Sequence, residues 1–191
     1  MTAEPSTLDT QQRKRGRRAL LGIIAVFFGP IALALLLNAN GWIPKAKTQG
    51  EQLSPPVDLR AATLRQADGA AYPWAPATRM RRLLVLAPAH CDARCASRAD
   101  ELEKLREIFG RDAEHLEVLW MGDYPADAPR PAGLRLIADD AAIRAKLPRA
   151  ADPAGAPVYV VDPYGFVILR YAPGADIAEM RKDLNKLLKM Q

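Results

Sequence analysis

The sequence predicts an α/β fold preceded by one transmembrane helix at the N-terminus. Three observations carry this prediction: a long uncharged run near the N-terminus, predicted strands that alternate with predicted helices, and two cysteines at a strand-to-helix turn. Strands that alternate with helices favour a largely parallel sheet with helices on both faces. A chain of 191 residues has room for one such domain together with extensions.

The uncharged run covers residues 19–37, ALLGIIAVFFGPIALALLL. As a helix it would be about 28 Å long, which is close to the roughly 30 Å hydrocarbon core of a bilayer. Its proline, Pro30, is tolerated in membrane helices, and Trp42 follows at the depth where interfacial aromatic residues lie. We therefore predict a transmembrane helix over residues 19–39.

The distribution of basic residues predicts the orientation of this helix. Five bases lie in the first 18 residues, whereas the first bases after the span are Lys45 and Lys47. By the positive-inside rule, residues 1–18 form a cytoplasmic tail and the rest is exported, which in a bacterium means a periplasmic domain anchored in the inner membrane. A cleaved signal peptide is the alternative, but its apolar core is usually shorter, and residues 38–40 make a poor cleavage site.

Composition excludes several function classes. Most of the net charge of +5 lies in the basic tail, so the folded part lacks the excess of bases that a nucleic-acid interface needs. The sequence also contains no Gly-rich phosphate loop, no serine–histidine pairing and no C-x-x-C-H haem attachment motif. We therefore expect no nucleic acid as a partner and no hydrolase or nucleotide-binding chemistry.

The first elements expected after the membrane are a tether, a strand and a helix. Residues 40–60 contain several prolines and few large apolar side chains, which predicts an extended tether that leads to a domain over residues 61–191. Residues 83–87 form a continuous apolar run, typical of a strand buried on both faces. Apolar residues at helical spacing then predict a helix over residues 92–109, which ends at Gly110.

The second half of the domain is expected to alternate in the same way. Strands are predicted at 115–121 and 134–138, followed by a helix that Asp139-Asp140 caps and Pro148 stops. A turn at residues 162–165 predicts an antiparallel hairpin at the edge of the sheet, and a closing helix with one apolar face comes last. The hairpin strands are 158–161 and 166–171, Asp176 caps the closing helix, and its apolar face comprises Ile177, Met180, Leu184, Leu187 and Leu188.

Cys91 and Cys95 are the only cysteines of the chain. Cys91 comes where the predicted strand turns into the predicted helix, and the N-terminus of a helix favours a thiolate. Side chains four residues apart on a helix face the same side, so both sulfurs can reach one Cu(I) ion, a soft metal that prefers thiolate ligands. A disulfide is possible if Cys91 lies just outside the first turn. A structural bridge, or two inert thiols, is the alternative.

Other polar and aromatic residues give weaker signals. His90 precedes the first cysteine, where it could lower the pKa of the thiol or serve as a further metal ligand, or be an ordinary turn residue. We expect His115 to start a strand at the surface, and the aspartates of the predicted caps and turns to be structural rather than catalytic. Tryptophans Trp42, Trp74 and Trp120 are expected at the membrane interface or in the core.

The order of elements and the cysteine pair at the start of a helix resemble the thioredoxin fold. The resemblance places Pro157 where thioredoxin-like proteins keep a cis-proline that faces the cysteines, although sequence leaves the isomer open. The C-x-x-x-C spacing behind one N-terminal span is similar to the Sco/SenC copper-chaperone branch of cytochrome c oxidase assembly. This chain departs from that branch in two places: Gly155 stands where the family has a histidine copper ligand, and Asp92 replaces the usual proline.

The resemblance implies a function for the cysteine pair. It implies Cys91, Cys95 and Pro157 as catalytic residues of dithiol exchange, and Cys91 and Cys95 as Cu(I) ligands. The position of His90 beside Cys91, and not the resemblance, makes it the candidate third ligand. The expected partners are the inner membrane and a cytochrome c oxidase subunit or another copper chaperone. Because the family's distal histidine is absent, thiol chemistry comes before direct Cu(I) carriage. A non-catalytic interaction module and a general thiol reductase for cytochrome c maturation remain as alternatives.

Overall fold

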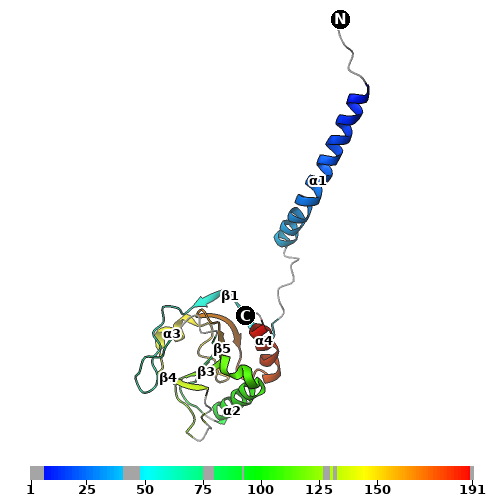
Figure 1. The fold of residues 1–191 in the computed structure, drawn as a ribbon. Coiled ribbons are helices and arrows are strands. Elements are labelled where there is room, and N and C mark those ends of the chain that lie inside the picture. Colours follow the sequence, from blue (N-terminus) through cyan, green and yellow to red (C-terminus); the bar gives the residue numbers. More distant parts are fainter. Residues whose placement is uncertain are drawn as a thin grey trace. The chain divides into compact units, whose positions relative to one another are not determined.

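A computed structural model describes residues 7–40, 48–74, 80–91, 93–126, 130 and 133–189. The chain forms two compact units, Met1–Lys47 and Thr48–Gln191. The first contains one long helix and the second contains a sheet covered by helices (Figure 1). Trp42, Lys45 and Lys47, which entered the prediction of the membrane anchor, lie outside the described residues.

Helix α1 (Thr7–Ala39) contains the predicted membrane span. Within it, Arg17–Leu37 is long and apolar enough to cross a membrane, and large apolar side chains such as Phe27 and Leu35 are exposed. A helix that is apolar all round is typical of a membrane span. The helix begins at Thr7, so much of the basic tail predicted over residues 1–18 is helical, because glutamine, lysine and arginine continue a helix readily.

The domain is built on one six-stranded sheet with the order β1-β6-β5-β2-β3-β4. Strands β2, β3 and β4 are parallel to one another, whereas β5 is antiparallel to β2 and β6, and β1 is antiparallel to β6. The strands are β1 (Glu51–Asp58), β2 (Arg81–Leu86), β3 (Leu116–Met121), β4 (Leu134–Ile137), β5 (Val158–Val161) and β6 (Phe166–Tyr171). The helices of the domain are α2 (Ala93–Ile108), η1 (a 3₁₀ helix, Gly110–His115), α3 (Ala141–Lys146) and α4 (Ile177–Lys189).

Most predicted elements are present at the predicted places. The hairpin strands β5 and β6 have the predicted bounds, and the first strand and helix differ from theirs by one or two residues. Alternate residues of β2 face two separate apolar clusters, which confirms a strand buried on both faces. His115 is an exception, because it ends the 3₁₀ helix η1 instead of starting a strand.

The tether predicted over residues 40–60 is too long at its C-terminal end. Residues 51–58 form β1, which pairs with β6 and covers the edge that the hairpin was expected to leave free. Pro55 and Pro56 suggested a chain without regular structure, but an edge strand tolerates proline because only one of its sides needs hydrogen bonds. The β5–β6 hairpin therefore lies inside the sheet, and β1 and β4 form its edges.

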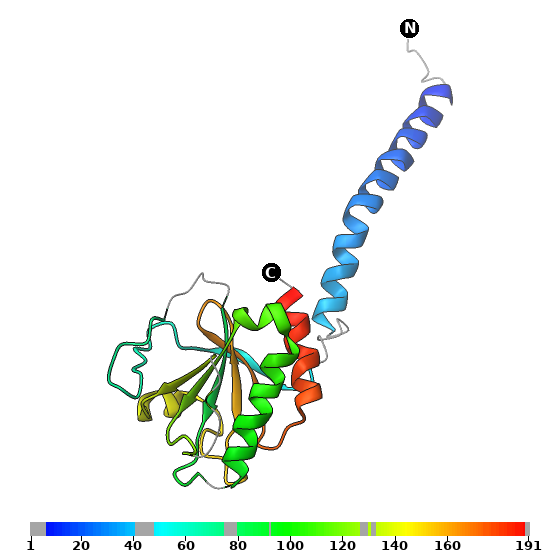
Figure 2. The same ribbon diagram turned by 60° about the horizontal axis from the view of Figure 1, so that its bottom comes forward.

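Helices cover both faces of the sheet. Figure 2 shows α2 and α4 side by side on one face and α3 on the other. Leu102 and Leu105 of α2 and Met180 and Leu184 of α4 share one core cluster with the first face. Ile143 of α3 belongs to the cluster on the second face. The predicted apolar face of the closing helix is confirmed, since its five residues are buried or packed against the first cluster.

Candidate functional site

Cys91 and Cys95 form a disulfide at the beginning of α2. Cys91 lies outside the helix, which begins at Ala93, and Cys95 lies in the first turn. Their Cα atoms are 5.4 Å apart, within the usual range for a disulfide. Bonding is possible because Cys91 is not held in helical geometry, as the sequence suggested. The pair therefore lies at the N-terminal, positive end of the α2 dipole, which stabilises a thiolate.

The two sulfurs differ in their access to solvent. Cys95 is 2% exposed and belongs to the core cluster between α2, α4 and the sheet. Cys91 is only partly buried and packs against the edge of that cluster. In a reduced pair, an incoming group can therefore reach Cys91 much more readily than Cys95.

Pro157 lies at the same end of the sheet as the cysteines. Its carbonyl oxygen accepts a hydrogen bond from the amide of Leu86, the last residue of β2, at 3.2 Å. The neighbouring Ala156 is buried in the same cluster as Cys95. The Ala156–Pro157 bond is trans, because Ser54–Pro55 is the one cis peptide bond among the described residues. Gly155, at φ 136°, makes the change of chain direction that precedes the strand.

His90 is exposed and lies directly before Cys91. Within the part of the chain that the structure describes, no group of three or more His, Cys, Asp or Glu side chains is placed to hold a metal ion. The donors that the fold brings together in the oxidised pair are the two cysteine sulfurs, and His90 as a third ligand stays a prediction. Two thiolates are a chemically suitable donor set for Cu(I) once the disulfide is reduced.

Arg98 connects the cysteine helix to the segment between β6 and α4. Its side chain is almost fully buried, and Nη1 donates to Ala175 O at 3.0 Å and to the Glu101 carboxylate at 2.9 Å. Nη2 donates to Ala172 O at 3.3 Å. A cavity of about 200 Å³ lies beside this guanidinium, lined by Ser97, Arg98, Glu101, Ala154, Gly155, Ala156, Pro173 and Gly174.

The segment from Ala87 to Cys91, which connects β2 to the cysteine pair, is called the cysteine loop. A second cavity, of about 430 Å³, lies beside it. Pro88 and Ala89 of that loop line it together with Asp139, Arg144 and residues 150–153 and 155. Asp152 in this wall accepts hydrogen bonds from the Ala154 amide and from Arg170 Nη2. These two bonds, the backbone one above all, hold the pKa of Asp152 below its usual range, so its carboxylate is ionised at neutral pH.

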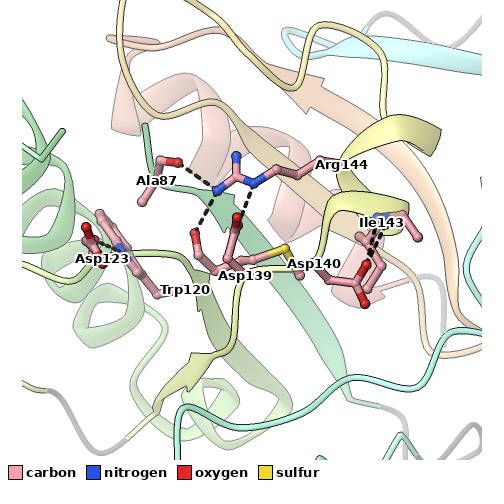
Figure 3. Close-up of polar contacts among 9 residues, drawn as sticks. Ala87, Trp120, Asp123, Asp139, Asp140, Ile143 and Arg144 are labelled. Carbon is pink, nitrogen blue, oxygen red and sulfur yellow. Dashed lines mark hydrogen bonds and ion pairs between the residues drawn. The ribbon is translucent and has the colours of Figure 1, made fainter. Parts of the chain in front are cut away.

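The predicted caps and turns have the structural functions expected of them. Asp140 accepts hydrogen bonds from the amides of Ala142 and Ile143 and is the N-cap of α3. Asp162 accepts from the amides of Tyr164 and Phe166 within the hairpin turn. Asp139 was expected to share the capping, but its carboxylate instead binds Arg144 at 2.5 Å (Figure 3). Trp120 is fully buried, and its Nε1 donates to Asp123 O.

Arg98 and Arg144 were not predicted from the sequence as residues of the site. Each is an arginine within a predicted helix, and an arginine there ordinarily lies on the solvated face. Their importance arises from carbonyl acceptors that belong to other elements, 23 to 77 residues away in the chain. The one local signal was the pair Asp139-Asp140 before α3: a helix needs a single N-cap, so the second carboxylate was available for another partner.

Comparisons with known proteins agree with this fold. A family described as "Transmembrane-like, thioredoxin-like, C-terminal domain" matches residues 82–191, and one described as "Transmembrane-like, N-terminal domain" matches residues 10–37. No curated protein matches the chain.

Several solved structures are similar in fold. Yeast Sco1 with copper bound has a TM-score of 0.53 and 13% identity, over 77% of this chain and 96% of that chain. BsSco, described as a member of the Sco family of cytochrome c oxidase assembly proteins with a disulfide switch, has a TM-score of 0.51 and 12% identity, over 76% and 98%. GPX1 of T. cruzi has a TM-score of 0.50 and 16% identity, over 69% and 97%.

These identities are low, so the similarity establishes the thioredoxin-like fold that the sequence predicted. The family match covers more than half of the chain and includes the cysteine loop, the sheet from β2 onward and the helices that follow. The N-terminal match falls within α1 and includes most of the apolar stretch. The chain is therefore a member of the transmembrane-like, thioredoxin-like family, with one N-terminal helix as its membrane anchor.

Proposed function

We propose that this protein assists the assembly of the copper site of cytochrome c oxidase through reversible oxidation of Cys91 and Cys95. One observation carries the proposal: an accessible Cys91 is bonded to a buried Cys95 at the N-terminus of α2. The fold similarity to copper-bound yeast Sco1 and to BsSco supports the choice of process. The basic cluster before the span supports a periplasmic location for the domain, on the bacterial inner membrane.

The thiol reaction begins with the reduced pair. The Cys91 thiolate attacks one sulfur of a disulfide in the partner, so that a mixed disulfide forms and one partner thiolate leaves. The Cys95 thiolate then attacks Cys91, which closes the internal disulfide and releases the second partner thiolate. Two electrons pass from this protein to the partner, whose cysteines become free to bind copper. A dithiol reductant of the same compartment must then reduce Cys91–Cys95 again.

Copper carriage is the second use of the same pair. Here Cu(I) is cargo, held by both thiolates of the reduced protein, with the exposed His90 as the proposed third donor. Oxidation of the pair removes both thiolates and would release the ion. Gly155 stands where the Sco/SenC branch has its histidine copper ligand. Thiol exchange is therefore the first choice between the two activities.

An anaerobic Cu(I) titration against a competing chelator separates these activities. The reduced full-length protein in detergent is compared with Cys91→Ser and His90→Ala variants. One-to-one binding that Cys91→Ser abolishes would establish copper carriage, and weaker binding in His90→Ala would identify the third donor. If the chelator retains all of the copper, carriage is excluded and thiol exchange remains.

Trapping experiments test the order of the thiol steps. We expect Cys95→Ser to accumulate a mixed disulfide between Cys91 and a partner, because the buried resolving thiol is missing. Cys91→Ser should trap little, since the remaining thiol is 2% exposed. Mass spectrometry of the trapped complex identifies the partner. Equal trapping by both variants would contradict the assignment of Cys91 as the attacking thiol.

Cells that carry both substitutions distinguish the alternatives. Loss of the copper oxidase alone is the expected result. Loss of all c-type cytochromes would instead indicate a reductant for cytochrome c maturation, and an intact oxidase would indicate a non-catalytic interaction module. The amount of the double variant in the membrane is measured by immunoblot, so that degradation is not mistaken for lost activity.

A further inference from the structure

The guanidinium of Arg144 lies where the sheet ends and the cysteine loop begins. The amide of Ala87 donates to Met121 O at 2.9 Å, which extends the β2–β3 ladder by one residue beyond β2. Arg144 Nη2 then donates to the carbonyl of the same Ala87 at 2.8 Å and approaches Met121 O at 3.4 Å. The side chain thus bridges the C-terminal ends of both strands, and its contact with Ala87 is drawn in Figure 3.

Arg144 is itself held in place. Its Nε donates to Asp139 Oδ1 at 2.5 Å, and its backbone belongs to α3, which Asp140 caps. Gly122 provides the space for the guanidinium. A Cβ at Gly122 would lie 3.1 Å from Arg144 Nη2 and 3.2 Å from the Ala87 Cβ, and the backbone there has a φ of 100°. The ends of β2 and β3 and the helix α3 therefore meet at Ala87, the first residue of the cysteine loop.

The loop from Ala87 to Cys91 is short, with three residues between them. Cys95 at the other side of the pair is fixed in α2 and buried in the core. In the reduced protein, the separation of the two thiols therefore depends on how firmly the strand end of the loop is held. The contacts of Arg144 with Ala87 and Met121 are made at that end.

We propose that Arg144 is a positioning residue for the Cys91–Cys95 pair. By holding the carbonyl of Ala87, it restricts the loop in the reduced state and keeps the Cys91 sulfur close to that of Cys95. Restricted motion raises the effective concentration of one thiol at the other, which favours disulfide closure after the partner has been attacked. Asp139 acts through Arg144 by orienting the guanidinium. This inference rests on the proposed dithiol chemistry and adds the residues that set its equilibrium.

The test is the equilibrium between the reduced and oxidised pair in glutathione buffers, measured on the full-length protein in detergent. Replacing Arg144 by glutamine is expected to lower the equilibrium constant for disulfide formation about tenfold. Arg144→Lys should have an intermediate constant, because an ammonium cannot donate as a fork to both Asp139 and Ala87. Gly122→Ala retains the arginine but displaces it, and a reduced constant is expected there too.

Arg82→Gln is the matched control. Arg82 is a buried arginine at the opposite end of the same strand, where Nε donates to Tyr72 Oη and Nη1 to Met80 O. Its loss should destabilise the reduced and oxidised proteins equally and leave the glutathione equilibrium unchanged. A constant for Arg144→Gln within about twofold of the wild type would contradict the inference. A Cys91–Cys95 disulfide that neither glutathione nor a stronger dithiol such as dithiothreitol reduces in the folded wild type would overturn the proposed function itself.

Discussion

At the scale of single residues, Tyr72 shows how the domain uses a buried polar group away from the cysteines. Its hydroxyl donates to Glu117 Oε2 and accepts from Arg82 Nε at 2.7 Å, and the side chain is 6% exposed. Arg135 Nε lies 3.2 Å from the other oxygen of Glu117. The network joins the segment before β2 to strands β2, β3 and β4 at the end of the sheet opposite the disulfide.

This environment predicts a loss of stability at high pH. Burial, and then the hydrogen bond to Glu117, raise the pKa of Tyr72 to about 12. The unfolded chain releases this proton near pH 10, so between pH 10 and 12 the folded state binds more protons and stability falls as pH rises. The free energy of unfolding of Tyr72→Phe should therefore fall by about 2 kcal/mol less than that of the wild type across this interval. Urea unfolding at pH 8, 10 and 11.5 measures the difference.

The control for this experiment is the set of other buried tyrosines. Tyr159 and Tyr171 also have raised pKa values, chiefly because of burial, and they titrate in both proteins. Their contribution cancels when the free energies of unfolding of Tyr72→Phe and the wild type are subtracted at each pH. Identical pH dependence in Tyr72→Phe and the wild type would show that Tyr72 ionises in the folded state as easily as in the unfolded chain.

At the scale of elements, Asp183 of α4 holds the two residues that come directly before β1. Its Oδ2 accepts hydrogen bonds from the amides of Gln49 and Gly50 at 2.7 and 2.9 Å, and from the Tyr171 hydroxyl at 2.9 Å. The residue is 1% exposed. Gly50 is required for this approach, because a Cβ there would lie 2.7 Å from the Tyr171 ring. The first and last elements of the domain are thereby joined.

Asp183→Asn should destabilise the domain by about 2 kcal/mol, since hydrogen bonds to a charged acceptor are stronger than those to an amide. Urea denaturation measures this loss, and hydrogen exchange should show faster exchange of the Gln49 and Gly50 amides. Lys182→Gln, at an exposed neighbouring position of α4, is the control and should change stability by no more than about 0.5 kcal/mol. Slow exchange at Gly50 in Asp183→Asn would contradict the assigned contact.

At the scale of the whole molecule, the basic residues before the span predict its orientation. A periplasm-dependent reporter fused after Gln191 should be active in the wild type. Changing Arg13, Lys14, Arg15, Arg17 and Arg18 to glutamine removes the positive-inside signal, and the reporter should lose much of its activity. Alkaline extraction checks that both proteins remain in the membrane. Full activity in the variant would mean that another feature sets the orientation.

The sequence by itself determined the class of fold, the membrane-spanning helix and the place of the cysteine pair at the start of a helix. These are properties of local pattern: the apolar runs, the hairpin turn at 162–165, the cap at Asp176 and the cysteine spacing each report on a few consecutive residues. Helix and strand periods differ, so such patterns predict elements and their order. They also allowed a disulfide on the condition that Cys91 lies just outside the first turn, and Cys91 lies there.

Tertiary structure alone decided which residues surround the site. Residues 51–58 look like a tether until β6 offers them one row of hydrogen-bond partners. Arg144 looks like a surface residue until folding brings it to the carbonyls of Ala87 and Met121. The physical reason is the same in both cases: a hydrogen-bond acceptor supplied by a distant segment leaves no trace in the local periodicity of the residue that uses it.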